Sequence, residues 1–451
     1  MTNRQNTKRY LIIGLGLTGL SCARFCQAQN LNYGLCDTRS ELPGLESIKA
    51  EFVGVDVQLG LPSPNELDQY DELLVSPGID TNTDYFTAAR EQGIVISGDV
   101  QLFSEYCDKP VIAITGSNGK STVTTLVAEL LKADGIHAVA CGNIGVPVLD
   151  LLTTGQGIEV YVAELSSFQL ETTRNLGAKV ATILNISPDH MDRYGDMASY
   201  ERAKQRIFQQ ASAVVVNADD DHTRPVLDVS ERVSAYSIDA DKHAGFGIAH
   251  IDGSVWLMQG ERALVSAHDL RIRGLHNVAN ALAALALVDA AGYEISAEMI
   301  LALTNFGGLD HRCQWVANIS GVDYFNDSKG TNIGSTVAAI NGLAPQTEGK
   351  LWLIAGGEGK GQNFSELAEA CGDVEAAFLF GADAEMISDS ISATVKTAVT
   401  ETLDQALGLL VKEANPGDIV LFSPACASFD QFRNYVHRGE YFCQCVEELK
   451  S

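Results

Sequence analysis

Apolar and polar positions alternate between two patterns along the whole chain. Short runs rich in Val, Ile and Leu are followed by longer stretches whose apolar residues recur at helical spacing. Runs of the first kind are typical of buried strands and those of the second of amphipathic helices, so repeated β-α-β units and parallel sheets are predicted. Helices are expected at 121–133 and 277–291. Strands are expected at 10–13, 33–36, 72–75, 94–96, 111–115, 160–164, 180–185, 213–216, 351–355, 377–380 and 418–422.

The order of these elements divides the chain into three blocks. The strands of the first block end near residue 98, and the second block opens with the apolar run VIAIT at 111–115. A glycine pair in TNFGGLDHRC, residues 304–313, interrupts the helical pattern and marks a second boundary. We therefore predict an α/β chain with three domains, at residues 1–98, 99–305 and 306–451.

The composition of the chain limits which partners and which cellular location are expected. The net charge of -27 argues against nucleic acid and anionic membranes as partners. The polar N-terminus lacks the apolar stretch of a signal peptide, and the longest apolar helical run, residues 281–288, is far shorter than the ~20 residues of a membrane span. The ten cysteines form no paired C-x-x-C set, so we expect reduced thiols and a cytoplasmic protein.

The first glycine-rich loop is GLGLTG, with Gly14, Gly16 and Gly19 between a predicted strand and a predicted helix. This spacing is typical of a Rossmann-like domain that binds a diphosphate at the N-terminus of the helix. Asp37 ends the next strand, where such folds place a carboxylate that binds ribose hydroxyls. NAD and a UDP-sugar both carry a diphosphate and a ribose, and glycines that serve only strand-to-helix packing are the third interpretation.

The second glycine-rich loop, TGSNGKST at 115–122, ends like a phosphate-binding loop but is short. The position where the usual pattern has its first glycine holds Ile114. The backbone N–H groups of the loop can still surround a phosphate, with Lys120 against the β- and γ-phosphates and Ser121 as a ligand of Mg²⁺. The sequence therefore predicts a nucleotide site with its phosphates at this loop.

Two further polar residues follow neighbouring strands. Glu164 closes one strand and His190 comes shortly after the end of another. Ligands gather at the carboxyl ends of parallel strands, so we expect both residues near the loop, with Glu164 holding the metal. A carboxylate paired at a sheet edge and an ordinary polar histidine are the alternatives. Lys204, in the amphipathic helix of SYERAKQRIF, has on pattern alone the character of a solvated lysine.

A series of segments strengthens this interpretation: TGSNGKST, AELSSFQLE, LNISPDHMDRYG, YERAKQRIF, GLHNVANALAALA, DHRC and NDSKGTN. Their order resembles that of the Mur ligases, the ATP-dependent amide-forming enzymes of peptidoglycan precursor synthesis. The segments GLGLTGLSCAR, CDTR, SPGI and SPACASFDQF resemble the members that add D-glutamate. The resemblance implies an N-terminal Rossmann-like domain, a central P-loop-type ATPase domain and a C-terminal Rossmann-like domain.

The implied reaction joins D-glutamate to UDP-N-acetylmuramoyl-L-alanine through an acyl phosphate, with ATP and Mg²⁺, in a cytoplasmic monomer. The implied catalytic residues are Lys120, His190 and Lys204. The implied ligands of the metal are Ser121, Glu164, His190 and Lys204, the last as a CO₂-derived carbamate. The implied ATP-binding residues are Gly116, Ser117, Asn118, Gly119, Lys120, Ser121, Thr122, Asn277, Asn280, Arg312 and Asp327.

The remaining implied contacts belong to the other two substrates. The implied residues for the UDP substrate are Leu17, Thr18, Asp37, Thr38, Arg39, Gly78 and Asn143. Those for D-glutamate are Lys329, Thr331, Lys360, Ser428 and Tyr435. Ser428 is expected at a helix start, where free N–H groups bind anions.

Three other functions stay open at this point. The chain could be a ligase of the same family that adds a different amino acid. It could also be a nicotinamide-dependent oxidoreductase fused to a P-loop domain, or a nucleotide-dependent binding protein without chemistry.

Overall fold

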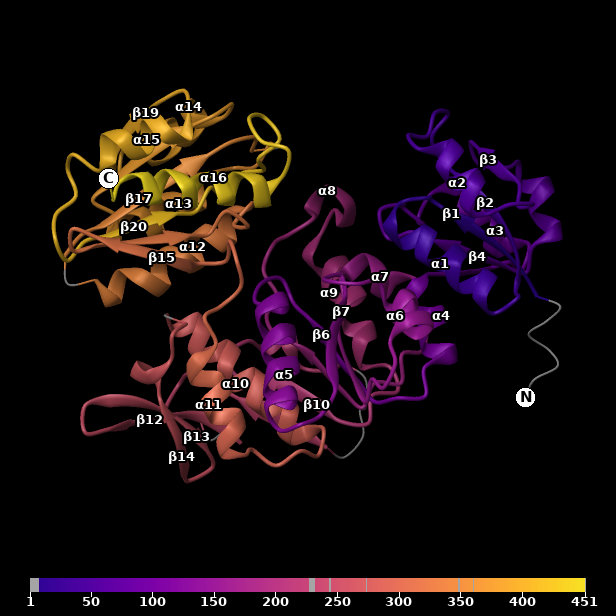
Figure 1. Cartoon of the computed structure of the whole chain (residues 1–451), viewed down its shortest axis with the longest axis horizontal. Coiled ribbons are helices and arrows are strands. Elements are labelled where there is room, and N and C mark those ends of the chain that lie inside the picture. The colour runs from indigo at the N-terminus through magenta and orange to yellow at the C-terminus, as the bar shows by residue number, and fades with distance from the viewer. Residues whose placement is uncertain are drawn as a thin grey trace.

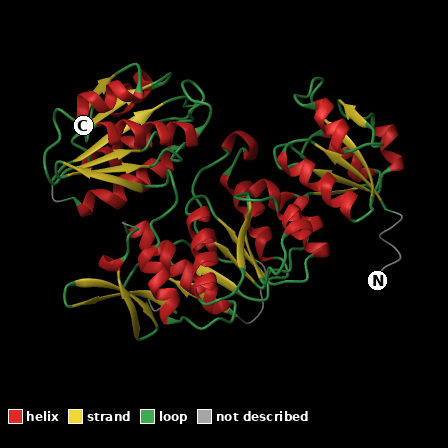
Figure 2. Cartoon of the chain, in the orientation of Figure 1, coloured by secondary structure: helices red, strands yellow, loops and turns green. Residues whose placement is uncertain are grey.

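The strands of the chain form three sheets, each flanked by helices, in the computed structural model (Figures 1 and 2). The structure describes residues 8–226, 232–242, 245–272, 274–347, 349–359 and 361–450. This three-domain α/β architecture confirms the predicted fold class. Within these described ranges, no helix is both long and apolar enough to cross a membrane.

The first sheet is fully parallel, in the order β3-β2-β1-β4-β5. Its strands are β1 (Arg9–Ile13), β2 (Asn32–Asp37), β3 (Val57–Leu59), β4 (Glu72–Val75) and β5 (Val95–Ser97). Its helices are α1 (Leu17–Ala28), α2 (Leu45–Glu51) and α3 (Asp84–Glu91). The short edge strand β3 was not predicted, because its residues are only partly buried and form no continuous apolar run.

The middle sheet has the order β14-β13-β12-β11-β10-β9-β6-β8-β7. Its parallel strands are β6 (Val111–Thr115), β7 (Ala138–Gly142), β8 (Val160–Glu164), β9 (Val180–Ile183), β10 (Val214–Asn217) and β11 (Val233–Tyr236). Three further strands were not predicted: β12 (Phe246–Ile251), β13 (Ser254–Gln259) and β14 (Arg262–Ser266). β12 is parallel to β11, and β13 is antiparallel to both β12 and β14. β9 ends at Ile183, two residues before the predicted end, which leaves Asn185 in the loop that leads to the site.

The helices of the middle domain cover the faces of this sheet and leave free the edge at which its parallel strands end. They are α4 (Asp99–Tyr106), α5 (Lys120–Ala133), α6 (Val148–Thr154), α7 (Ser167–Glu171), α8 (Met191–Tyr194), α9 (Met197–Gln205), α10 (Leu275–Ala290) and α11 (Ala297–Asn305). The segment 281–288 of α10 is fully buried, as an all-apolar helix requires. α10 packs against α5, whose N-terminus follows the end of β6.

The third sheet has the order β15-β16-β20-β17-β18-β19. Its strands are β15 (Gln314–Ile319), β16 (Val322–Asn326), β17 (Leu351–Gly356), β18 (Ala376–Phe380), β19 (Lys396–Val399) and β20 (Ile419–Phe422), with only β15 antiparallel to its neighbour. Its helices are α12 (Ile333–Leu343), α13 (Ser365–Ala370), α14 (Ala384–Ile391), α15 (Leu403–Leu410) and α16 (Tyr435–Glu448).

The helix start predicted at Ser428 is wrong. Ser428 lies in a turn after β20, where its carbonyl oxygen accepts from the backbone N–H of Phe432 (2.8 Å), and the next helix begins at Tyr435. The helix begins later because Asn434 is its N-cap, where Oδ1 accepts from the backbone N–H of His437 at 2.9 Å.

Candidate active site

The loop after β6 adopts a phosphate-loop geometry despite its short length. Gly119 is the N-cap of α5 with φ +80, and a Cβ at this position would lie 2.5 Å from Oδ1 of Asn280. The backbone N–H of Asn118 donates to Oδ1 of Asn185, which follows β9, at 2.8 Å. The loop is therefore anchored to the next strand, with the N-terminus of a 14-residue helix directly behind it.

Lys120 folds back across this loop. Its Nζ donates to the carbonyl oxygens of Gly116 (2.8 Å) and Ser117 (2.9 Å). Burial lowers the pKa of its amine, and the carboxylate of Glu164 counteracts that shift. The amine is thus held at the loop, where a phosphate would offer it an anionic partner in place of carbonyl oxygens.

Ser121 and Glu164 form the centre of the site. The Ser121 hydroxyl donates to Oε2 of Glu164 at 2.5 Å, and Nδ2 of Asn143, after β7, donates to Oε1 of the same carboxylate at 2.9 Å. Nη2 of Arg312 reaches in from the third domain and donates to Oγ of Ser121 at 2.8 Å. A hydroxyl and a carboxylate side by side are the hard oxygen donors that Mg²⁺ prefers.

Lys204 is buried, with 2% of its surface exposed, in contrast to the solvated lysine that the residue pattern predicts. α9 turns this side chain inward, so that Nζ donates to the carbonyl oxygen of Gly116 at 2.9 Å and Oγ1 of Thr115 at 3.3 Å. Burial and the nearby Lys120 amine lower its pKa well below the ordinary value. A lysine in this state is uncharged more often, and the uncharged amine is the nucleophile that reacts with CO₂.

His190 lies at the same edge of the sheet but apart from this group. It has φ +55, its side chain is 46% exposed, and its ring packs on Phe168 with 4.8 Å between ring centroids. Within the part of the chain that the structure describes, no three His, Cys, Asp or Glu side chains converge as a metal cluster. Of the predicted metal ligands, Ser121 and Glu164 are thus in contact, whereas His190 contacts neither of them.

The third domain brings several of its predicted residues together. Nζ of Lys329 lies over the ring of Tyr435 at 5.2 Å, and the backbone N–H of Thr331 donates to the Lys329 carbonyl oxygen. Burial and the nearby Arg312 lower the pKa of Lys329 to about 8. Ser428 is buried, and Lys360 lies outside the described residues.

The predicted UDP-binding residues other than Asn143, which lies beside Glu164 in the middle domain, lie at or shortly after the carboxyl ends of strands in the first sheet. The Asp37 carboxylate accepts from the backbone N–H of Leu15 (2.8 Å) and from Nε of Arg39 (2.7 Å), which together hold its pKa at about 2. Leu17, at the start of α1, is 83% exposed, and Gly78 is also exposed. A Cβ at Gly16 would meet nothing within 4 Å, so the loop backbone is open to a ligand.

Comparison with known proteins decides the family. The family described as "Mur ligase MurD-like, N-terminal domain" matches residues 8–98, the "Mur ligase middle domain" matches 114–288, and the "Mur ligase, glutamate ligase domain" matches 311–426. The UDP-N-acetylmuramoylalanine-D-glutamate ligase of Methylobacillus flagellatus is 46% identical over 448 residues, 98% of this chain and 97% of that protein. The enzyme of the same name from Pseudomonas fluorescens is 44% identical over 440 residues, 97% and 98% of the two chains. The chain belongs to the Mur ligase family.

Solved structures share the fold of this Mur ligase. The MurF ligase of Thermotoga maritima in complex with ADP has a TM-score of 0.61 at 16% identity and covers 100% of this chain and 99% of its own. A pseudomurein peptide ligase type C from Methanothermus fervidus has a TM-score of 0.62 at 17% identity, with coverages of 98% and 100%.

Several of the predicted ATP-binding residues of this Mur ligase, together with Lys329, line one cavity between the middle and third domains. It has a volume of about 160 Å³, and its walls include Asn118, Asn277, Asn280, Arg312, Asp327 and Lys329. Nε of Arg312 is buried and has no hydrogen-bond partner among the described residues. Burial raises the pKa of Asp327 to about 7, although its carboxylate accepts from Oγ of Ser423.

One residue of the site was missed from the sequence. Arg438 on α16 is fully buried, and its guanidinium donates to the carbonyl oxygens of Ser328 (2.8 Å), Cys426 (3.0 Å) and Ala427 (3.1 Å). It therefore joins the loop after β16 to the loop after β20, which carry Lys329 and Ser428. An arginine in an amphipathic helix is usually solvated, so the residue pattern offered no signal for this role.

Proposed function

We propose that this Mur ligase joins D-glutamate to UDP-N-acetylmuramoyl-L-alanine and converts ATP to ADP and phosphate. The observation that carries the proposal is the contact of Arg312 with Ser121 beside Glu164, which combines groups from two domains at the phosphate loop. The relatives named for this reaction match almost the whole chain, including the glutamate ligase domain.

The first step is attack of the L-alanyl carboxylate on the γ-phosphate of ATP. Two anions must approach each other, so cationic groups have to offset their repulsion and stabilise the charge on the transferring group. We assign this role to Lys120 and Arg312, and their position supports it, because Lys120 bonds the phosphate loop and Nε of Arg312 has no partner among the described residues. The products are ADP and an acyl phosphate of the substrate.

The residues present fit Mg²⁺. Ser121 and Glu164 supply adjacent oxygen donors, and we place Lys204, as a carbamate, and His190 in the same ligand set. The carbamate converts a buried amine into a carboxylate-like ligand. When bound, Mg²⁺ neutralises phosphate charge and orients the reacting oxygens.

In the second step the amine of D-glutamate attacks the acyl phosphate, and an amide forms with loss of phosphate. Lys329, Thr331, Lys360, Ser428 and Tyr435 are the residues proposed to bind the two carboxylates of D-glutamate. Lys329 supplies a cation near Tyr435, at the rim of the nucleotide cavity. Since water would destroy the acyl phosphate, we expect the domains to close before chemistry.

The UDP part of the substrate is assigned to the first domain. Leu17, Thr18, Asp37, Thr38, Arg39 and Gly78 are proposed to bind it, with Asn143 contacting the muramoyl group. The domain limits 1–98, 99–305 and 306–451, a monomeric state and a cytoplasmic location belong to the same proposal.

The test is phosphate release from ATP with each substrate omitted in turn. Release should require both D-glutamate and UDP-N-acetylmuramoyl-L-alanine, and replacing D-glutamate by L-alanine or a diamino acid should abolish it. Release with a different amino acid would assign the chain to another branch of the family. Tight NADH binding without binding of the UDP substrate would instead support the oxidoreductase interpretation.

A further inference from the structure

We propose that Arg193 is a positioning residue that couples the loop bound to the UDP substrate to the orientation of His190. The inference rests on the proposed function, because it concerns how two of its binding elements are held together. Arg193 lies at the end of α8, three residues after His190, on the wall of a cleft of about 950 Å³ between the first two domains.

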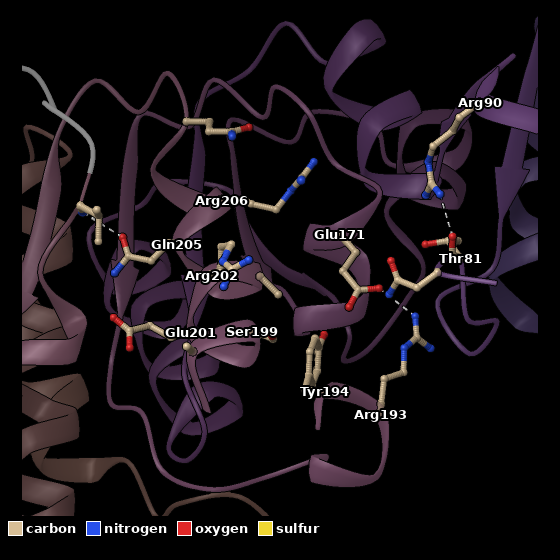
Figure 3. A pocket seen from close by; sticks show the side chains of 15 residues that line it. Thr81, Arg90, Glu171, Arg193, Tyr194, Ser199, Glu201, Arg202, Gln205 and Arg206 are labelled. Atoms are coloured by element: carbon tan, nitrogen blue, oxygen red, sulfur yellow. Dashed lines mark hydrogen bonds and ion pairs between the residues drawn. The ribbon is translucent and has the colours of Figure 1, made fainter. Parts of the chain in front are cut away.

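The guanidinium of Arg193 bridges these two domains. Nη2 donates to Oε2 of Glu171 on α7 at 2.8 Å (Figure 3). It also donates to the carbonyl oxygen of Ile79 at 3.3 Å. Nε lies 3.8 Å from Oδ1 of Asp80. Ile79 and Asp80 directly follow Gly78, so the bridge is made to the loop assigned to the UDP substrate.

The same guanidinium also supports the ring that holds His190. Its central carbon lies 4.5 Å from the centroid of the Phe168 ring, and the ring of His190 packs on Phe168 at 4.8 Å. The Arg193 side chain is only 11% exposed and that of Glu171 only 13%. A cation over an aromatic ring and a desolvated ion pair both fix geometry, so Arg193 and Phe168 restrict where the His190 ring can lie.

The other arginines of this cleft make different contacts. Arg90 donates to the carbonyl oxygen of Thr81 (2.9 Å) within the first domain, and Arg206 donates to that of Thr173 (2.9 Å) within the second. Arg202 lines the same cleft and is exposed. Among the arginines of this cleft, and within the described residues, Arg193 therefore stands out because its hydrogen bonds reach both domains.

A guanidinium is needed because its planar fork can serve several partners at once. A lysine at position 193 keeps the charge and can pair with Glu171, but it cannot keep the fork geometry and the flat contact with Phe168 together. The structure thus predicts a graded series, with Arg best, Lys intermediate and Ala worst.

The experiment measures steady-state kinetics of the full-length enzyme with Arg193→Lys, Arg193→Ala, Glu171→Gln and, as the matched control, Arg202→Ala. In Arg193→Ala we expect the KM for UDP-N-acetylmuramoyl-L-alanine and the Mg²⁺ concentration for half-maximal rate each to rise about tenfold, as is typical for loss of a group that orients a metal ligand. The KM for ATP should stay within about twofold of the wild-type value, because Arg193 does not line the cavity that holds the predicted ATP-binding residues. Arg193→Lys should recover part of both effects, and Arg202→Ala should show neither.

Two results would overturn the proposal. One is an unchanged Mg²⁺ dependence in Arg193→Ala, and the other is an equal change in Arg202→Ala, which would indicate a general effect of charge in the cleft. If Arg193→Ala does not fold, Arg193→Lys and Glu171→Gln decide by the same two measurements. Failure of the proposed function is a separate outcome, because the wild-type enzyme would then release no phosphate with the named substrates.

Discussion

Replacing the buried carboxyl of Asp99 by an amide should stabilise the protein at neutral pH. Asp99 begins α4, is 4% exposed, and accepts from Nε2 of Gln169 on α7 at 3.2 Å, while its Oδ1 has no partner among the described residues. Burial raises the pKa of this carboxyl from 3.8 to about 6. That rise corresponds to about 3 kcal/mol of preference for the protonated form in the folded state.

The sign follows from the proton balance. The folded protein binds this proton more tightly than the unfolded chain. Ionisation of Asp99 therefore does not lower the free energy of unfolding below pH ~4, and it lowers it by the full ~3 kcal/mol above pH ~6. Asp99→Asn does not titrate but can still accept from Gln169. The difference in free energy of unfolding between Asp99→Asn and wild type should therefore be about 1 kcal/mol larger, in favour of the variant, at pH 8 than at pH 5.

Urea unfolding followed by circular dichroism at these two pH values measures the difference. Asp84→Asn is the matched control, since Asp84 also begins a helix, α3, but is exposed. A difference between Asp99→Asn and wild type that is the same at pH 5 and pH 8 would refute the argument. So would an equal pH dependence in the control.

Three predictions concern the site itself. Lys204→Ala should lower kcat at least ~1,000-fold, because the carbamate ligand proposed for Mg²⁺ could no longer form. The Kd for ATP, measured by calorimetry, should stay near the wild-type value, and near-normal turnover would restore the solvated-lysine interpretation. The KM for D-glutamate should rise about tenfold per pH unit above pH ~8, because Lys329 loses its proton there and with it the charge that would bind a carboxylate. In Lys329→Arg, which stays charged, this rise should vanish. Gly119→Ala should weaken ATP binding at least ~10-fold, since its φ of +80 and a Cβ only 2.5 Å from Asn280 are both unfavourable. Gly135→Ala, with φ +83 and open space around its Cβ, is the control, and equal losses in both variants would show that backbone strain alone is responsible.

The predictions from sequence were most accurate where one local property decides the structure. β1, β4, β6 and β8 consist mostly of apolar residues because they are almost entirely buried, and their limits agree with the predicted ones within a residue. β12 to β14 were missed, since only some of their residues are buried and the pairing that makes them strands is with each other. Strands that depend on such pairing have no periodicity strong enough to find them.

The same division applies to the site. The spacing of Gly116, Gly119, Lys120 and Ser121 predicts the phosphate loop, because the glycines and backbone N–H groups of such a loop are local in sequence. The contact between Arg312 and Ser121 joins two domains across 191 positions of sequence, and no local pattern encodes it.

By itself, the sequence determined the α/β class, the two glycine-rich loops and the series of motifs of a Mur ligase. Those features depend on backbone conformation and hydrophobic period, which neighbouring residues set. Only the tertiary structure decided that Lys204 is buried against the phosphate loop, that Arg438 joins two loops of the third domain, and that Arg193 bridges two domains. Lys204 and Arg438 lie in sequence patterns typical of solvated side chains, and the contacts of all three cations depend on which distant carbonyl, carboxylate or ring the fold brings to them.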